Sequence, residues 1–204
     1  GVQNDKEQSH EIMDYAFNNG VNFFDTAEQY PSPSSKELYG TTEKIIGEWV
    51  TKTKNRKDIV LATKISGPGV PWIRGGGLQY DILNIKKAVE DSLTRLNTNY
   101  IDLYQLHWPE RFFQNFAFDD NIKLTENYNK LESILRIFQD LIKEGKIRYI
   151  GLSNDDLSGL KAYVELINKN SFPEITSIQN RYNLLFRNYK PELFEFCKTN
   201  KISF

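Results

Sequence analysis

The sequence predicts an α/β fold in which parallel strands alternate with helices. Short, nearly continuous apolar runs alternate with longer segments whose apolar residues recur at helical spacing. Continuous apolar runs are typical of parallel strands that are covered on both faces. Five of these runs also end in polar residues suited to chemistry. In a barrel of parallel strands all those ends lie on one face, where active sites are built, so the pattern suggests an enzyme.

The expected helices each carry one apolar stripe. Residues 6–18 form the first helix, and Gly20 follows as a stop signal. Residues 131–144 have the clearest amphipathic pattern, and Gly145 ends that helix. Pro191 suits the first turn of the last helix. The other helices are expected at residues 41–52, 82–96 and 156–169.

The apolar runs between these helices are the expected strands. They cover residues 21–27, 59–65, 101–107, 147–153, 175–180 and, as the start of another strand, 202–204. The structural alternative is a doubly wound open sheet, which usually carries a glycine-rich phosphate loop after an early strand. No G-x-G-x-x-G follows residues 21–27, and residues 75–77 are interpreted as a flexible loop. The long connections 66–81 and 108–130 are expected to form lids or pocket walls.

Composition narrows the class of protein. The 204 residues suit one domain, or a larger domain cut short, and the formal net charge is −1. Without a basic stripe the sequence does not indicate a nucleic-acid partner, and no apolar run reaches the ~20 residues that span a bilayer. The polar first residues do not resemble a signal peptide. Cys197, the only cysteine, is expected in a helix core and excludes an internal disulfide, so the cytoplasm is the expected location.

Four of the polar residues that follow strands could together move a proton to a carbonyl oxygen. Tyr30 is a weak acid with a normal pKa near ~10, and a nearby ammonium such as that of Lys64 would lower this pKa. A partly buried ammonium needs a carboxylate partner, which Asp25 on the preceding strand can supply. The imidazole of His107 can polarise or orient the carbonyl.

Each of these residues also has an ordinary structural interpretation. Asp25 could cap a turn, and Tyr30 could be an amphipathic wall residue. Lys64 alone would be solvated, and His107 could be a hydrogen-bonded core histidine. The interpretations are linked, because a lysine on a buried face needs an acid and one is available nearby. His10, on the first helix, is expected at the surface.

Five motifs that occur in order carry a resemblance to a known family. They are G-V-N-F-F-D-T-A-E-Q-Y at 20–30, L-A-T-K at 61–64, D-L-Y-Q-L-H-W at 102–108, G-K-I-R-Y-I-G-L-S-N at 145–154 and S-I-Q-N-R-Y-N-L at 177–184. Together they resemble the aldo-keto reductase superfamily, over the whole chain. The most similar branch is the Tas-like reductases, which are related to the potassium-channel beta subunits.

The resemblance implies a (β/α)8 TIM barrel that uses NADPH to reduce an aldehyde or ketone to an alcohol. Tyr30 would be the proton donor, Lys64 and Asp25 the pair that tunes it, and His107 the residue that orients the substrate carbonyl. These four residues would form the catalytic set. No metal ion is implied.

The resemblance also implies a nicotinamide site. Ser153, Asn154 and Gln179 would hold the carboxamide, because amide and hydroxyl groups can satisfy both its C=O and its NH₂. Asp25 is included in this cofactor-binding set. The alternative for Ser153 and Asn154 is an N-cap of the helix at 156–169, and both roles can hold together.

The sequence departs from the family pattern at both ends. A first barrel strand and hairpin, a nicotinamide-stacking aromatic and the 2′-phosphate loop have no match. Residues 1–204 are therefore expected to form one partial barrel domain with about strands 2–6 and the start of 7, and to bind NADPH weakly or not at all alone. The alternatives are a regulatory or binding subunit, with a homo-oligomer or channel-like partner, and an inactive fragment. An apolar substrate pocket is expected from the aromatic residues Trp72, Trp108, Phe112, Phe113 and Phe116.

Overall fold

A curved sheet of five parallel strands forms the centre of the molecule. The computed structural model describes residues 3–67, 69–76, 80–109, 113–114, 117–118, 128–187 and 191–204. The sheet has the order β1-β2-β3-β6-β7, and every neighbouring pair is parallel. The strands are β1 (Phe23–Asp25), β2 (Val60–Ile65), β3 (Ile101–Leu106), β6 (Ile147–Ser153) and β7 (Ile175–Gln179). Because this order follows the chain without the reversal of a doubly wound sheet, it confirms the barrel-type fold, here as an open half-barrel.

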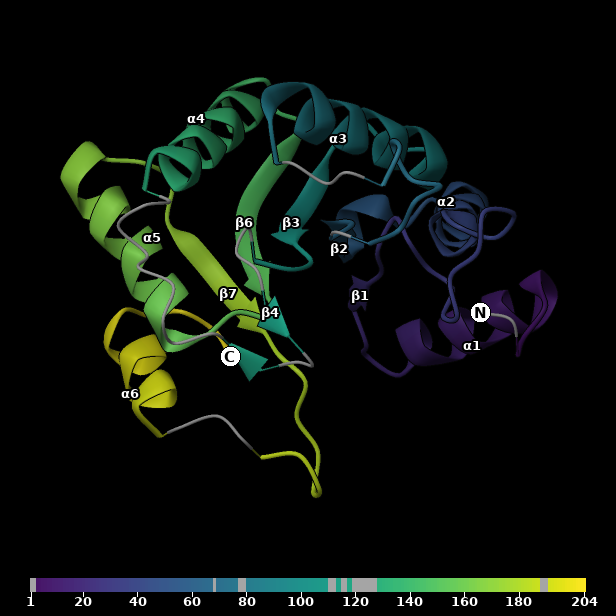
Figure 1. Cartoon of the computed structure of the whole chain (residues 1–204). Coiled ribbons are helices and arrows are strands. Elements are labelled where there is room, and N and C mark those ends of the chain that lie inside the picture. The colour runs from purple at the N-terminus through teal and green to yellow at the C-terminus, as the bar shows by residue number, and fades with distance from the viewer. Residues whose placement is uncertain are drawn as a thin grey trace.

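Helices cover the outer face of the sheet, as Figure 1 shows. They are α1 (Lys6–Asn18), α2 (Thr41–Thr53), α3 (Ile82–Leu96), α4 (Tyr128–Lys143), α5 (Leu157–Asn170) and α6 (Pro191–Thr199), with a short 3-10 turn η1 (Arg56–Asp58). The predicted helices are therefore confirmed to within three residues at each end. The connection expected at 108–130 also contains two short antiparallel strands that were not predicted, β4 (Phe113–Gln114) and β5 (Ala117–Phe118).

The strand boundaries differ most from the expected ones at the edges of the sheet. The β1 strand is shorter than the expected 21–27, because among the described residues it has a partner strand on one side only. Its pairing still continues irregularly, since the Thr26 N–H donates to the Ala62 carbonyl over 2.9 Å. At the other end Ser203 forms an isolated parallel bridge with Ser177. This bridge agrees with the expected start of another strand at 202–204.

The core lies between the sheet and the outer helices. Leu135 and Phe138 of α4 and Ile85 of α3 are almost completely buried against strand residues such as Ile101. These positions recur every three or four residues, so one stripe of each helix is removed from water. Cys197 on α6 is also buried, as expected. The packing fixes where each strand ends, and therefore where the polar residues that follow it lie.

One alternative interpretation and one local expectation were wrong. Ser153 and Asn154 do not cap the fifth helix; the N-cap is Asp156, whose carboxylate accepts from the Gly159 N–H over 2.8 Å. His10 is half-buried rather than at the surface, because its Nε2 lies 3.0 Å from the carbonyl oxygen of Ile45 on α2. Its neighbours on α1 show no pattern that reveals this contact.

None of the described helices combines the length and the apolar character that crossing a membrane requires.

Candidate active site

The carboxyl ends of β1 and β2 bring Asp25 and Lys64 into contact. In the strand register Asp25 lies opposite Ala62, so Lys64 is two residues further along on the same face. Its Nζ donates to Asp25 Oδ2 over 2.5 Å and to the Thr26 carbonyl over 2.8 Å. The Lys64 side chain is 1% exposed and that of Asp25 is 26% exposed. The interpretation of Lys64 as a solvated residue is therefore excluded.

Tyr30 and His107 lie beside this ion pair. Tyr30 is placed by a tight turn in which its N–H donates to the Ala27 carbonyl over 3.0 Å. Its ring meets the His107 ring edge to face, with centroids 5.6 Å apart and an interplanar angle of 81°. The Lys64 Nζ lies 5.6 Å from the centroid of the Tyr30 ring. Four side chains at the carboxyl ends of three strands therefore come together. They are those of Tyr30, Lys64, Asp25 and His107.

Burial sets the protonation of the tyrosine and the lysine. Loss of hydration, followed by the negative charge of Asp25, raises the pKa of Tyr30 above its ordinary value. The net shift is therefore opposite to the one that the sequence argument expected from the ammonium. The physical reason is that burial and the Asp25 carboxylate both favour the protonated phenol. Burial also lowers the pKa of Lys64, while the Asp25 carboxylate acts in the opposite direction.

His107 is a neutral imidazole with an unused polar atom. Burial, reinforced by the positive charge of Lys64, lowers its pKa to about 3. Its Nδ1 is buried and has no hydrogen-bond partner among the described residues. The ring also stacks on Trp108, with centroids 6.2 Å apart. Buried polar atoms are normally satisfied, so an orphaned nitrogen of this kind indicates a place where a ligand can bind.

Two glutamines complete the surroundings of Asp25. Gln105 donates to Asp25 Oδ1 over 2.9 Å, and Gln179 donates to Asp25 Oδ2 over 3.2 Å. Gln105 was missed in the sequence because it lies inside an apolar run. The signal that could have found it is its period-two relation to His107, which places both side chains on one face of the strand.

The residues expected at a nicotinamide lie next to His107. Ser153 is in register with Gln179, and the Asn154 N–H donates to the Gln179 carbonyl over 3.0 Å. Asn154 Nδ2 donates to the His107 carbonyl over 2.9 Å and to Ser153 Oγ over 3.2 Å. Asn154 has a φ of 55°, a left-handed conformation that asparagine tolerates better than most residues. The turn after β6 thus aims its side chain across the end of β3.

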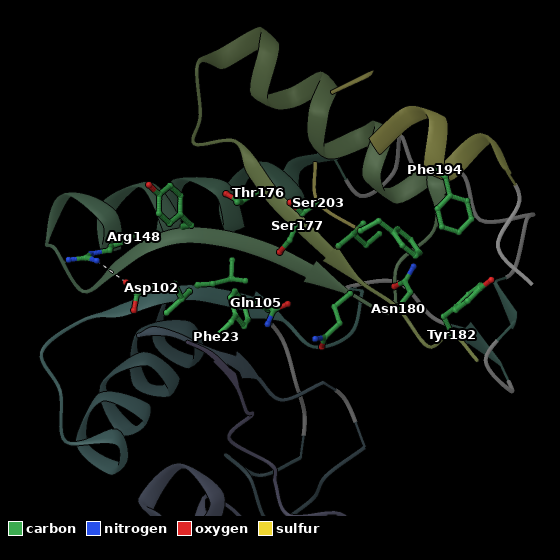
Figure 2. A pocket seen from close by; sticks show the side chains of 16 residues that line it. Phe23, Asp102, Gln105, Arg148, Thr176, Ser177, Asn180, Tyr182, Phe194 and Ser203 are labelled. Carbon is green, nitrogen blue, oxygen red and sulfur yellow. Dashed lines mark hydrogen bonds and ion pairs between the residues drawn. The ribbon is translucent and has the colours of Figure 1, made fainter. Parts of the chain in front are cut away.

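A groove of about 870 Å³ runs along the inner face of the sheet. Figure 2 shows that it extends from Asp102 and Arg148 at one end to Asn180, Tyr182 and Phe194 at the other. Gln105 and Gln179, whose amides donate to Asp25, line it as well. The described residues that line it do not include Tyr30, Lys64 or His107. The link between the groove and the catalytic candidates is the pair of hydrogen bonds that Gln105 and Gln179 donate to Asp25.

The expected aromatic pocket can be followed only in part. Trp72 and Trp108 are half-buried. Phe112, Phe116 and the side chain of Phe113 lie outside the described residues.

Comparison with known proteins identifies the family. The sequence signature of the Aldo/keto reductase family matches residues 1–204. The chain belongs to this family. The protein tas of Escherichia coli (strain K12) is 37% identical over 202 residues, which cover 96% of this chain and 57% of that protein. The uncharacterized oxidoreductase YrpG of Bacillus subtilis (strain 168) is 32% identical over 203 residues, covering 95% of this chain and 54% of that protein.

Solved aldo-keto reductases share the fold. The aldo-keto reductase AKR11C1 from Bacillus halodurans (holo form) superposes with a TM-score of 0.72 at 30% identity, covering 98% of this chain and 56% of that one. The thermostable aldo-keto reductase Tm1743, in complex with the inhibitor epalrestat, gives a TM-score of 0.67 at 30% identity, covering 97% and 58%. The chain spans about half the length of the curated relatives it matches. The resemblance to the Tas-like aldo-keto reductases is thereby confirmed.

Proposed function

We propose that this aldo-keto reductase chain carries the acid–base side of an NADPH-dependent reduction of an aldehyde or ketone to an alcohol. The observation that carries the proposal is the convergence of Tyr30, His107 and the Lys64–Asp25 ion pair at one end of the sheet. Several of the relatives are named as oxidoreductases or reductases, and the family match covers the whole chain.

Tyr30 would supply the proton. Because its pKa is raised, the phenol is fully protonated at neutral pH and keeps its proton until negative charge develops on the carbonyl oxygen. The Tyr30 Oη–H bond then breaks as the alcohol O–H bond forms. Lys64 would stabilise the phenolate left behind, and Asp25 would hold that ammonium in place. When bound, reduced nicotinamide supplies the hydride that the carbonyl carbon accepts.

His107 would orient the substrate. With a pKa of about 3 the imidazole is neutral, so one ring nitrogen donates and the other accepts a hydrogen bond. A neutral donor can polarise a carbonyl without competing with Tyr30 as the acid. The edge-to-face contact with Tyr30 sets the direction from which both groups approach one oxygen atom.

The residues after β6 and β7 fit a nicotinamide carboxamide. Ser153 Oγ accepts a hydrogen bond from Asn154, which leaves its own O–H to donate to the carboxamide C=O. The side-chain oxygen of Gln179 can accept from the carboxamide NH₂, since its Nε2 is engaged by Asp25. Asp25 would thus contribute to cofactor binding by holding Gln179.

The test is NADPH oxidation with a panel of aldehydes, ketones and quinones. Wild-type protein is compared with Tyr30→Phe and with Tyr15→Phe, a control on the exposed face of α1. Loss of a positioned general acid lowers kcat on the order of 10²–10⁴-fold, so Tyr30→Phe should lose activity to that extent while the control keeps it. Equal rates for wild type and Tyr30→Phe would show that Tyr30 is not the proton donor.

A role as a regulatory or binding subunit, with a homo-oligomer or channel-like partner, stays a prediction, as does a cytoplasmic location. Retention of a complete set of proton-transfer side chains supports the enzymatic role more directly.

A further inference from the structure

A buried ion pair that the proposed reaction does not use lies next to the Tyr30 turn. Glu28 is 1% exposed, and the Arg74 guanidinium meets it in a two-pronged contact, with Nη1 and Nη2 each 2.6 Å from a carboxylate oxygen. The Ser66 N–H also donates to Glu28 Oε1 over 2.5 Å. Paired, two-pronged contacts of this kind fix direction as well as distance. The Glu28 side chain is therefore held from two sides.

Arg74 reaches Glu28 from a loop with an unusual backbone. Its φ is 45°, and Gly75 and Gly76 follow at 78° and 73°, so three successive residues adopt left-handed conformations. A side chain on Gly76 would place its Cβ 2.4 Å from the Pro71 Cα, so the turn is tightly closed. A non-glycine residue in this region is conformationally costly and persists where the surroundings hold it. Arg74 in this conformation contacts Glu28 through both of its Nη atoms.

The same loop contacts the residue before Tyr30 and the residue after His107. At its start the Ser66 hydroxyl donates to Gln29 Oε1 over 2.9 Å, directly before Tyr30. A Cβ on Gly67 would lie 2.1 Å from Trp108 Cδ1, so the loop backbone packs on the residue that follows His107. At its end the Tyr80 hydroxyl donates to the Trp108 carbonyl over 2.8 Å. The loop thus joins the Tyr30 segment to the His107 segment.

We propose that Arg74 and Glu28 are positioning residues, which lock this loop and so fix the Tyr30 ring against His107. The placement of the Tyr30 ring can be tested by itself. Only the effect of that placement on catalysis rests on the proposed function. Glu28 is suited to the task because its N–H donates to the Lys64 carbonyl over 3.2 Å. Its backbone is thus attached to β2, while its side chain is attached to the loop. Displacement of Arg74 would free the turn that carries Tyr30.

A second buried pair provides a matched control. Arg95 Nε donates to Glu43 Oε2 over 2.6 Å, and the two side chains are 13% and 0% exposed, against 12% and 1% for Arg74 and Glu28. This pair joins α2 to α3, and among the described residues it forms no hydrogen bond with residues 28–30, although the charges of Arg95 and Glu28 act on each other at longer range. Arg95→Gln should therefore destabilise the fold as Arg74→Gln does, without moving Tyr30.

The experiment follows the Tyr30 ring directly by NMR of protein labelled with ¹³C at the tyrosine Cζ. The chain has eleven tyrosines, so the Tyr30 resonance is assigned as the one that disappears in Tyr30→Phe. We expect Arg74→Gln to shift that resonance clearly, and Arg95→Gln to shift it much less, because Glu43 and Arg95 act on the site only through their charges. Arg74→Lys, which keeps the charge and loses the two-pronged contact, should give a smaller shift.

Two results would overturn the proposal: an unmoved Tyr30 resonance in Arg74→Gln, or an equal shift in Arg95→Gln. If Arg74→Gln does not fold, Arg74→Lys carries the same comparison. NADPH oxidation in the same samples separates this inference from the proposed function. Misplacing a reacting group by about 1 Å costs on the order of 10²-fold in rate, so kcat should fall in Arg74→Gln with KM nearly unchanged. A Tyr30 shift in protein whose wild type binds NADPH but does not oxidise it would support positioning and contradict the proposed reaction.

Discussion

Gln179, at the end of β7, donates a hydrogen bond to Asp25, at the end of β1, over 3.2 Å. These two strands are the outermost in the five-stranded sheet, so the contact crosses the inside of the curve rather than running along it. It joins the proposed cofactor residues to the ion pair that supports Tyr30. A substitution at either residue should therefore affect both cofactor binding and the Lys64–Asp25 ion pair.

Replacing Gln179 should weaken cofactor binding more than folding. Its side chain is at the exposed rim, so Gln179→Ala should change the free energy of unfolding by no more than about 1 kcal/mol. The Kd for NADPH, measured by fluorescence titration into the millimolar range, should rise about tenfold, as expected for one lost hydrogen bond. Gln179→Glu keeps an acceptor but places a carboxylate beside Asp25, and it should weaken binding further. An unchanged Kd in both variants would remove Gln179 from the cofactor site.

The Lys64–Asp25 pair should respond unequally to loss of its two members. Asp25→Asn leaves a buried ammonium without a carboxylate and should destabilise the fold by about 3 kcal/mol. Lys64→Met removes the buried charge itself and leaves Asp25 partly exposed with its two glutamine donors, so it should cost about 1 kcal/mol. Urea unfolding at neutral pH measures both. Equal losses, or a larger loss in Lys64→Met, would mean that the ammonium is better hydrated than its burial indicates.

His107 should make stability depend on pH. Its pKa is about 3 in the folded protein and about 6.5 in the unfolded chain, so below pH 6.5 the unfolded state binds the extra proton. Stability is therefore lost as the pH falls from about 6.5 towards 3, and the loss at pH 5 relative to pH 8 should be about 2 kcal/mol. Urea unfolding at both values should show this difference, and it should disappear in His107→Gln. The same pH dependence in the variant would assign it to another group.

Much of the fold was readable from local pattern. The strand 147–153 and the helices 6–18 and 82–96 were predicted with the bounds that the structure has, because each carries a complete period of apolar residues. The length of the β1 strand was overestimated. The residues of a strand do not reveal whether it has a partner strand on both sides, and β1 has one on one side only among the described residues. The sequence also predicted that Asp25, Lys64 and His107 lie at the carboxyl ends of strands, because each comes at or near the end of an apolar run.

The unpredicted features depend on contacts between distant residues. Gln105 looked like part of an apolar strand until Asp25, 80 positions away, was placed beside it. Arg74 and Glu28 are 46 positions apart, and Arg74 stands in a loop without periodicity. The direction of the Tyr30 pKa shift was wrong for the same reason. The sequence contains an ammonium and a carboxylate, but only the structure shows that the tyrosine is buried and that the carboxylate acts on it in the same direction as burial.

The most direct measurement of the central claim is the pH dependence of kcat/KM for carbonyl reduction, which reports the pKa values of the protein before the substrate binds. If Tyr30 donates the proton and its pKa is raised by burial, kcat/KM should stay constant from neutrality and fall only above about pH 10, where the phenol ionises. Tyr30→Phe should lose most of the rate, and its residual activity should lack that fall. A fall in kcat/KM near pH 7 or 8 that persists in Tyr30→Phe would contradict the assignment of Tyr30 as the acid.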